Sequence, residues 1–594
     1  GGNRWTGYNW ETNASNAGRD WYYQNDTHMG TGPAGSAVRG PLNAAAANDR
    51  ALVVTVPING YVAGDTAGPI TRTQALNHSR FKEIVPNKEA KFPGQPLSLT
   101  PSASDGYVFT DEFVNWVEQT RDPSTPVFYS LDNEPGLWGE PLPADWHPGN
   151  PNTNPRTPPH AKGRTHGALH PSTPTFAELR DKTIAHAGAI KDVNPSALVF
   201  GGVGYGWQDF VSLQDAPDRN SHQSPSHPGG DESGEMHYYE FLLQQVAAAE
   251  ASQGRTLMDV LDLHWYPEAQ GGGVRITENN NSAAVVAARL QAPRSLWDPT
   301  YVETSWISQW GTWQGSPGTP GPVRLLPRVQ RDIDDFKPGT KIAITEYNYG
   351  GTNHISGGIA QADVLGVFGC EGVFAANFWN LHGNSNSQFA SGAFKMYLNY
   401  DGEGGQFGDT SIEAATDSIA KSAVYASVDA DDPSRVVVVA INRTASVQSA
   451  AMQLTHDLRF DFAEVYRLTS ASPNPVQAAN IPIDLVNAFI YEMPAYSVST
   501  LVLRQAAEGD FNNDGVIDAD DLGHWRNGFG SGPNAGFSDG DNDRDGEVDG
   551  QDLLAWQRAL GAAAAGAASA VPEPGTLLLI APTAALLAAY AARQ

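Results

Sequence analysis

The chain has 594 residues, a formal net charge of −29 and a sequence pI near 4.8. This length allows two or three domains. The acidity argues against nucleic acid and anionic membranes as partners, because like charges repel, and suits a neutral substrate such as a polysaccharide. The single cysteine, Cys370, excludes an intrachain disulfide, and its Gly-flanked apolar setting predicts a small core residue.

Residues 1–380 alternate strand-like and helix-like segments, which predicts βα units and a parallel sheet. The expected strands are Gly2–Trp5, Leu52–Pro57, Val127–Leu131, Ala197–Gly202, Val260–Trp265, Ile342–Thr345 and Val373–Trp379. The expected helices between them include Asp111–Gln119, Phe176–Lys191, Met236–Ala251, Ser282–Gln291, Val323–Phe336 and Ile359–Phe368.

Seven strands are one fewer than a (β/α)₈ barrel contains. If Val373–Trp379 is the eighth strand, Val127–Leu131 is the fourth and Ile342–Thr345 the seventh, so the first would precede Gly1. The sequence begins at Gly1, without an initiating Met or a signal peptide, as expected for a trimmed chain. We therefore expect an α/β fold over residues 1–395, a TIM-like (β/α)₈ barrel with its first strand missing from this chain.

Two glutamates each end one of these apolar strands. Glu134 follows Val127–Leu131, and Glu346 follows Ile342–Thr345. Parallel barrel strands carry such side chains to one rim, where catalytic residues collect. Either glutamate alone would be interpreted as a solvated strand-end residue. A pair beside Asn, Tyr and Trp instead predicts the two carboxyls that cleave a glycosidic bond.

Two long polar loops, Gly136–Pro174 and Leu213–Gly234, follow strand ends and carry six histidines. Their spacings match no zinc signature, so we interpret them as solvated loop residues. These histidines are His147, His160, His166, His170, His222 and His227.

After residue 400 the pattern changes to strands without intervening helices, which predicts an all-β sandwich over residues 396–505. The expected strands are Ala423–Ser427, Arg435–Asn442, Ser449–Leu454, Phe462–Leu468 and Tyr496–Leu503.

Two tandem repeats at residues 508–561 predict a small α-helical module that binds Ca²⁺. Each places carboxylate or amide oxygens at positions 1, 3, 5, 9 and 12 of a twelve-residue loop, with Gly at position 6 and a backbone carbonyl at position 7. Short helices are expected at Leu522–Trp525 and Leu553–Leu560. The predicted ligands are Asp510, Asn512, Asp514, Val516, Asp518 and Asp521 in the first loop, and Asp541, Asp543, Asp545, Glu547, Asp549 and Asp552 in the second.

The end of the chain is predicted to be a linker followed by an apolar helix. Residues 562–570 are a small-residue linker, and Val571-Pro-Glu-Pro-Gly575 precedes an apolar stretch from Thr576 to Ala592. That stretch is barely long enough to cross a bilayer. Its position and basic end favour a membrane-associated sorting tail at residues 571–594 over a disordered tail.

Several stretches of residues 1–505 resemble glycoside hydrolase family 44: Gly1–Gly18, Leu131–Trp138, Leu261–Pro267, Arg294–Pro299, Ile344–Asn348 and Ala393–Tyr397. The resemblance implies a TIM-like barrel packed on a β-sandwich, and endo-acting, retaining cleavage of β-1,4-glucans such as cellulose derivatives and xyloglucan. It implies that Glu134, in Asn133-Glu134-Pro135, is the acid/base. It also implies that Glu346, in Thr345-Glu346-Tyr347-Asn348, is the nucleophile.

Neighbouring residues are expected to bind substrate. Asn133 is placed to hold the sugar 2-hydroxyl, or else to cap the backbone. Tyr347 or Tyr266 would donate to Glu346, and His264 is either a rim residue or a catalytic helper. Trp379 is a candidate floor for the scissile sugar, Trp5, Trp10 and Trp138 are further platforms, and Arg4 is a candidate charge near the nucleophile.

The C-terminal repeats resemble type I dockerins, which implies a cohesin-like partner. Loop positions 10 and 11 are Ala519-Asp520 and Gly550-Gln551 rather than the usual interface pairs. Val571-Pro-Glu-Pro onward resembles the PEP-CTERM sorting signal, which implies recognition by exosortase, export to a bacterial envelope or beyond it, and transient membrane association.

Two alternatives stay open at this point. One is a retaining xylanase or mannanase, because the loops that form the subsites determine which sugar binds. The other is a calcium-dependent surface or scaffold protein that binds glucan without cleaving it.

Overall fold

The computed structural model describes residues 2–139, 142, 165–222, 236–310, 320–380, 386–432, 434–483 and 485–569. Two compact units make up the chain. The first comprises Gly1–Thr352 and Val364–Ser387, and the second Asn353–Asp363 and Gln388–Gln594. The boundary expected at residue 395 falls inside helix α12 (Gln388–Leu398), which belongs to the second unit.

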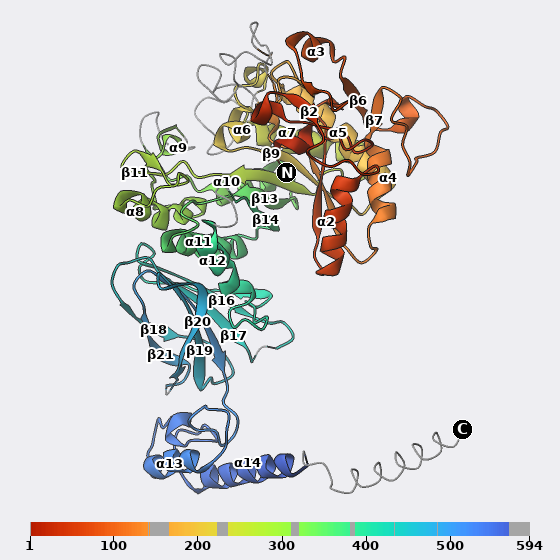
Figure 1. The fold of residues 1–594 in the computed structure, drawn as a ribbon. Helices are drawn as coiled ribbons and strands as arrows, with labels where there is room; N and C mark the ends of the chain where they lie inside the picture. The colour runs from red at the N-terminus through yellow and green to blue at the C-terminus, as the bar shows by residue number, and fades with distance from the viewer. Residues whose placement is uncertain are drawn as a thin grey trace, which may run out of the picture. The chain divides into compact units, whose positions relative to one another are not determined.

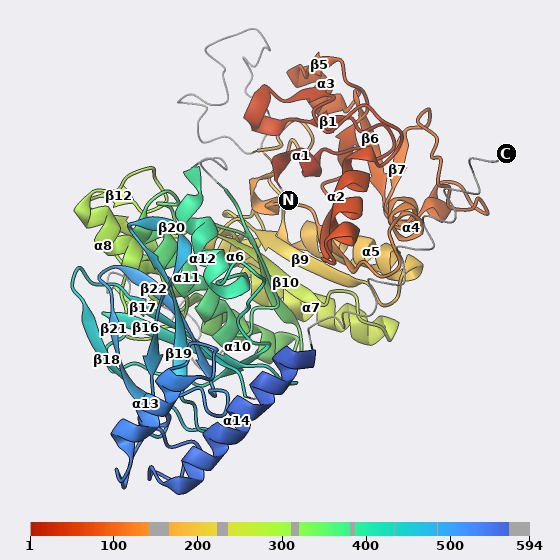
Figure 2. The same ribbon diagram turned by 60° about the horizontal axis from the view of Figure 1, so that its bottom comes forward.

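A six-stranded parallel sheet forms the centre of the first unit, in the order β14-β13-β10-β9-β8-β3. Figure 1 labels β9, β13 and β14 of this sheet, and Figure 2 labels β9 and β10. Near-continuous apolar runs form these strands, as expected where helices cover a parallel sheet. Six predicted strands are thereby confirmed, in the order expected for the third to eighth strands of a barrel. They are β3 (Leu52–Val56), β8 (Val127–Leu131), β9 (Leu198–Gly204), β10 (Val260–Trp265), β13 (Lys341–Tyr347) and β14 (Ala375–Phe378).

The strand predicted at Gly2–Trp5 is wrong, because the segment forms helix α1 (Asn3–Thr6). Gly2 has φ 93°, a conformation that favours glycine, and Gly7 follows the helix directly.

The six predicted helices of the first 380 residues are confirmed with small shifts of their ends. α5 packs against α4 and α7, and α7 packs against α10. Leu325, Leu326, Val329 and Ile333 of α10 recur at helical spacing and are buried. The six are α4 (Thr110–Thr120), α5 (Phe176–Val193), α7 (Tyr238–Gln253), α8 (Ala283–Gln291), α10 (Leu325–Phe336) and α11 (Ile355–Cys370).

Cys370 is exposed, so its predicted place in the core is wrong. It is the last residue of α11, and the preceding Gly369 is exposed as well. Burial along α11 therefore ends at Phe368, two residues before the helix does.

Short elements of the first unit were not predicted, because two to six residues carry little periodicity. They are β1 (Ser15–Asn16), β2 (Gln24–Asp26), α2 (Ser36–Ala47, the one longer element), β4 (Tyr61–Ala63), β5 (Gly68–Pro69), α3 (Arg72–Asn77), β6 (Phe81–Val85), β7 (Tyr107–Phe109), α6 (Trp207–Ser212), β11 (Gln270–Gly271), β12 (Val274–Arg275) and α9 (Trp306–Trp310).

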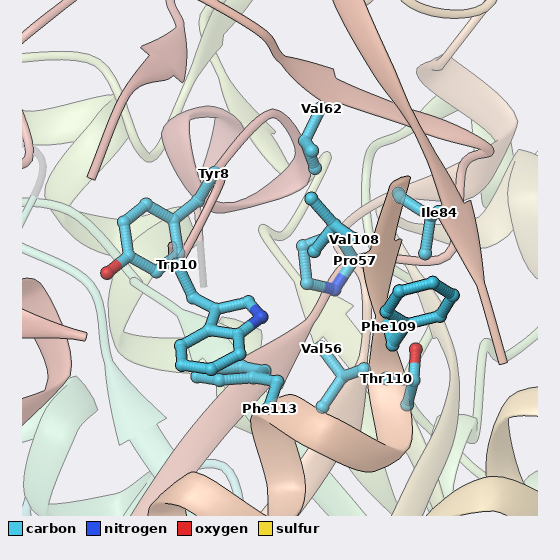
Figure 3. Close-up of a pocket in the computed structure, with 10 residues that line it drawn as sticks. All are labelled: Tyr8, Trp10, Val56, Pro57, Val62, Ile84, Val108, Phe109, Thr110 and Phe113. Carbon is cyan, nitrogen blue, oxygen red and sulfur yellow. The ribbon is translucent and has the colours of Figure 1, made fainter. Parts of the chain in front are cut away.

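A small apolar cavity of about 10 Å³ lies among these N-terminal elements (Figure 3). Trp10 stacks on Phe113 with ring centroids 5.5 Å apart, and Tyr8, Val56 and Phe109 complete much of the wall. A space this small and this apolar holds no sugar ring, so it is a packing defect of the core rather than a binding site.

The second unit contains the predicted sandwich. One sheet has the order β15-β16-β17-β22-β19-β20, and the other pairs β18 with β21. Val438, Val465 and Leu501 of the large sheet enclose a core with Phe489 and Tyr491 of β21. The strands are β15 (Thr410–Ile412), β16 (Ser422–Val428), β17 (Val436–Asn442), β18 (Gln448–Gln453), β19 (Phe462–Thr469), β20 (Ser472–Pro482), β21 (Ala488–Met493) and β22 (Ser497–Arg504).

β20 was not predicted because prolines 473, 475 and 482 interrupt it. Proline lacks the N–H that a central strand needs, and it is tolerated at a sheet edge. β20 is such an edge strand, paired only with β19 in the large sheet.

A two-helix module follows the sandwich, with α13 (Ala519–Gly528) and α14 (Gly550–Ser569) each after one acidic loop (Figure 1). Phe511, Phe537 and Trp556 are buried together between them. The predicted linker at 562–570 is wrong over its described part, because α14 continues to Ser569 through an alanine-rich run of high helix propensity. The predicted tail at 571–594 lies outside the described residues. Within the described ranges, no helix has both the length and the apolarity needed to span a bilayer.

Candidate active site

Glu134 stands at the carboxyl end of β8 on a tightly held turn. Asp132 and Glu134 have φ values of 68° and 46°, in the left-handed region that costs energy for non-glycine residues. The buried Asp132 carboxylate accepts the amide N–H groups of Ile58 (2.5 Å), Asn59 (3.0 Å) and Asn133 (2.9 Å). The Glu134 amide donates to the Val203 carbonyl at 3.0 Å, which ties the turn to β9.

Glu346 lies near the end of β13, directly opposite His264 of β10 in the parallel pairing. It is 6% exposed. Tyr266, just beyond β10, donates its hydroxyl to Glu346 Oε2 at 3.0 Å. Glu346 Oε1 is buried and has no hydrogen-bond partner among the described residues.

His264 brings the two glutamates into one cluster. Its Nδ1 lies 3.0 Å from Glu134 Oε1 and 3.5 Å from Glu346 Oε2. The three side-chain atoms all lie within 4.8 Å of one another. Strand ends 212 residues apart in the chain therefore place two carboxylates at the same nitrogen of one imidazole.

Burial sets the electrostatics of this cluster. It raises the pKa of Glu134 to about 7, with a smaller contribution from the charge of Asp20. Burial also raises the pKa of Glu346, and the charge of Glu134 raises it further. His264 and the hydrogen bond from Tyr266 act in the other direction and lower it. Burial lowers the pKa of His264, although Glu346 and Asp262 act in the other direction. Both glutamates therefore keep a proton more readily than free glutamate does, and general acid catalysis needs a carboxyl that keeps its proton.

A cleft of about 290 Å³ opens on the Glu134 side of the cluster. Aromatic side chains dominate its lining, and Trp306 is 38% exposed there. Arg275 and Glu268 form an ion pair of 2.8 Å in the same wall. The lining includes Tyr205, Trp207, Trp265, Tyr266 and Trp306. Flat aromatic faces with a few polar groups are typical of a site for a sugar chain.

The structure decides between the two tyrosines. Tyr266 contacts Glu346, whereas Tyr347 is buried with its ring edge-on to Phe368 and Phe378. Tyr347 therefore packs in the core behind the strand.

The four predicted tryptophans differ in how far they are exposed. Trp379 is 41% exposed at the end of β14, so its ring is available to a ligand. Trp138 and Trp10 are buried, and Trp138 donates to the Asn133 carbonyl, so the prediction of a platform is wrong for both. Trp5 is half-buried against Tyr8.

Asn133 and Arg4 both have partners inside the protein. The side-chain oxygen of Asn133 accepts the Gly2 amide at 2.8 Å. Arg4 pairs with Asp26 at 2.5 Å, so its charge is matched locally rather than by Glu346.

The described loop histidines form no zinc site with other described residues. His170 lies 2.8 Å from Glu178, and His222 lies 3.3 Å from Asp218. His166 is buried rather than solvated, which lowers its pKa to about 3. His147, His160 and His227 lie outside the described residues. Among the residues that the structure describes, two groups lie close enough to hold a metal ion. They are the Glu134, His264 and Glu346 cluster, and Asp541, Asp543 and Asp552 of the second repeat.

Sequence reasoning missed several residues of this site. Trp207 and Trp306 come from short helices without a strong pattern, and nothing in their spacing points to the cleft. Asp132 and Asp262 carry a recognisable signal, because an ionisable residue within an apolar strand must have buried partners.

Comparisons with known proteins agree on one family. The model of glycoside hydrolase family 44 matches residues 14–269. A family 44 xyloglucanase of Paenibacillus polymyxa, solved with xyloglucan, is 34% identical, covers 85% of this chain and is itself 93% covered, with a TM-score of 0.74. The chain belongs to glycoside hydrolase family 44. It is therefore an enzyme of the glycosidase class.

Two curated relatives of this family 44 chain differ in length. Endoglucanase A of Paenibacillus lautus is 38% identical over 532 residues, which are 87% of this chain and 69% of the relative. Beta-mannanase/endoglucanase A of Caldicellulosiruptor saccharolyticus is 38% identical over 525 residues, which are 84% of this chain. The match spans 36% of that second relative, which is a much longer protein.

Proposed function

We propose that the chain is an endo-β-1,4-glucanase that hydrolyses cellulose-type glucans and xyloglucan with retention of configuration. The observation that carries the proposal is the approach of the Glu134 and Glu346 oxygens to within 4.8 Å. Retaining glycosidases hold their carboxyl groups about 5–5.5 Å apart, whereas inverting enzymes leave about 6.5–9.5 Å for a water molecule.

In the first step Glu346 attacks the anomeric carbon and Glu134 protonates the departing glycosidic oxygen. Oε1 of Glu346 is the attacking atom, because Tyr266 already occupies Oε2. Glu134 starts this step with its proton, consistent with a pKa of about 7. The product is a glycosyl ester on Glu346 and a free chain end.

In the second step water hydrolyses the ester, and Glu134 acts as its base. Repulsion between the carboxylates, which raises the pKa of Glu346, disappears while Glu346 is esterified. Glu134 then holds its charge more easily and can accept the proton of water. Release of Glu346 restores the starting state.

Neighbouring groups bind and orient the sugar. The Asn133 oxygen is taken by Gly2, so its amide NH₂ is the group we assign to the sugar 2-hydroxyl. Trp379 supplies an exposed indole for the scissile residue, and Trp306 another beside Glu134. Stacking on indole suits the apolar faces of glucose units.

The choice of polysaccharide is tested by a substrate panel. We expect faster release of reducing ends from carboxymethyl cellulose and xyloglucan than from xylan or mannan, with an early fall in viscosity that marks internal cleavage. Glu346→Gln should abolish activity on every substrate and thereby assign it to this site. Preference for mannan, which the name of the Caldicellulosiruptor relative includes, or for xylan, would correct the substrate. Binding of glucan without hydrolysis would favour the scaffold alternative.

We further propose that the two acidic loops bind Ca²⁺. The two loops have the same pattern of internal hydrogen bonds. Asp510 accepts the amide N–H groups of Asp514 and Gly515, and Asp541 accepts those of Asp545 and Gly546. Asp521 and Asp552, at position 12, likewise accept amides of their own loops. Such preformed loops present several oxygens to one hard cation.

Calorimetric titration of the chain with Ca²⁺ should show two sites. Asp552→Asn should remove one of them and lower the melting temperature of the C-terminal module in saturating Ca²⁺, because bound ligand contributes about RT ln(1 + [L]/Kd) to stability. Asp520→Asn changes the same charge at an exposed position that is not a predicted ligand, so it should retain both sites. A parent chain that takes up no Ca²⁺ would contradict the proposal.

The resemblance of this module to dockerins supports a cohesin-like partner as a further proposal. The Pro-Glu-Pro tail, which lies outside the described residues, supports processing by exosortase, export and transient membrane association. Pull-down with cohesins and cell fractionation of the full chain test these two assignments separately.

A further inference from the structure

We propose that Asp262 is a positioning residue for Glu346: its carboxylate holds the bulge in β13 that turns Glu346 toward the site. The inference rests on the proposed role of Glu346 as nucleophile. It adds a residue that contacts neither the substrate nor the reacting atoms.

The pairing of β13 with both of its neighbours shows the bulge. Leu263 of β10 lies opposite Ile344, but the next residue, His264, lies opposite Glu346. On the other side, Ala376 and Phe378 of β14 lie opposite Ile344 and Tyr347, so β13 again contains one extra residue. An extra residue bends a strand and changes which side chains share a face.

The extra residue decides where Glu346 points. Ala343 packs with Phe200 and Val260 in one cluster, so it shares a face of the sheet with them. Strict alternation would give that face Thr345 and Tyr347, and would turn Glu346 to the other side. On β10 alternation from Val260 leads to Asp262 and His264. The bulge brings Glu346 level with His264 on this face.

Asp262 satisfies the groups that the bulge leaves without partners. Its two oxygens accept the Thr345 amide at 3.1 Å and the Thr345 hydroxyl at 2.8 Å. Asp262 is 0% exposed, and its own carbonyl accepts the Tyr239 hydroxyl at 2.9 Å, which fixes its backbone. Burial raises the pKa of Asp262 to about 6, which is still below neutral pH. The group is therefore an anion at pH 7 and accepts both hydrogen bonds.

The test uses Asp262→Ala, Asp262→Asn and Thr345→Val with an aryl β-cellobioside as the probe. We expect Asp262→Ala to lower kcat about 100-fold, the effect of a misplaced reacting group, and to leave KM within about threefold. Asp262→Asn keeps one acceptor and the same shape, so it should recover most of the loss. Thr345→Val should fall between them, and Thr345→Ser, which keeps the hydroxyl, should be close to the parent.

Asp259→Ala is the matched control. Asp259 lies just before β10 at the other end of the strand, where it accepts the Val199 amide and the Lys191 ammonium, both at 2.9 Å. This variant removes a comparable set of bonds far along the strand from Glu346. We expect it to keep kcat close to the parent value.

A variant without the nucleophile separates misplacement of the Glu346 side chain from a general loss of structure in the site. In Glu346→Gly, azide replaces the carboxylate and attacks the anomeric carbon, forming a glycosyl azide as the aryl alcohol leaves. Adding Asp262→Ala should leave this rescued rate nearly unchanged. An equal loss in both backgrounds, or a parent-like kcat for Asp262→Ala, would overturn the inference. If Asp262→Ala does not fold, Thr345→Val against Thr345→Ser decides. Parent-like activity of Glu346→Gly alone would instead contradict the proposed function.

Discussion

Glu346→Gly should lower the hydrolysis of xyloglucan or carboxymethyl cellulose by about 10⁵-fold, the scale of losing a covalent nucleophile. The glycine variant lacks the carboxylate that forms the glycosyl ester, while Glu134 and Tyr266 keep their places. Initial rates of reducing-end release measure the loss. Sodium azide should restore turnover of an aryl β-cellobioside and give the α-glycosyl azide, because a single displacement inverts the anomeric centre.

Glu112→Gln is a suitable control for this result. Glu112 is 2% exposed on α4 and pairs with Lys88 at 2.5 Å, so it is a buried glutamate of comparable setting. We expect this variant to lose stability but to keep its turnover per folded molecule. If Glu346→Gly hydrolyses glucan as fast as Glu112→Gln does, the assignment of Glu346 as the nucleophile is wrong.

Glu134→Ala should show a loss that depends on the leaving group. With polysaccharide, whose sugar leaving group needs a proton, kcat/KM should fall about 10³-fold, within the range for general acid catalysis. With dinitrophenyl β-cellobioside, which departs without help, formation of the glycosyl ester should remain fast. The ester should then accumulate, because Glu134 is also the base that activates water. A burst of dinitrophenol followed by slow turnover measures both effects.

The pH profile provides an independent check on Glu134. The raised pKa of about 7 means that the acid is protonated below this value and loses its proton above it. Parent kcat/KM on polysaccharide should therefore decline as pH rises through 7. Glu134→Ala should lack this alkaline decline, and Asp111→Asn, a buried acid of α4, should retain it. An unchanged alkaline limb in Glu134→Ala would assign the titration to another group.

Much of the catalytic centre follows from strand ends that are visible in the sequence. β8 and β10 have the predicted limits, and β13 extends the prediction by one residue at its start and two at its end. Apolar runs that stop at Glu134, His264 and Glu346 were sufficient to bring these residues to one rim. Parallel pairing, rather than any local pattern, then set their separation.

Register is what the sequence did not reveal. A regular strand places Tyr347 and Glu346 on opposite faces, and only the bulge at Thr345 shows which of them enters the site. The same uncertainty left Tyr266 and Tyr347 as equal candidates. Bulges depend on the strands to either side, so one strand's sequence does not disclose them.

Tryptophans were also poorly predicted, for a related reason. Trp138 follows the catalytic motif closely, yet it is buried and donates to the Asn133 carbonyl. Trp306 has no motif beside it and is exposed in the cleft. An indole serves equally well as core and as platform, and the path of the loops decides between them.

The position of His264 has a consequence for how charge moves during turnover. Nδ1 of the imidazole faces both carboxylates, at 3.0 and 3.5 Å, and the opposite ring nitrogen has no hydrogen-bond partner among the described residues. In the tautomer that carries its proton on Nδ1, this N–H can donate to either carboxylate. In the proposed mechanism the anion is on Glu346 before the sugar is attacked, and on Glu134 once the ester forms. A single stationary dipole thus faces the negative charge in both halves of the cycle, and the ring has no need to turn or to change its protonation.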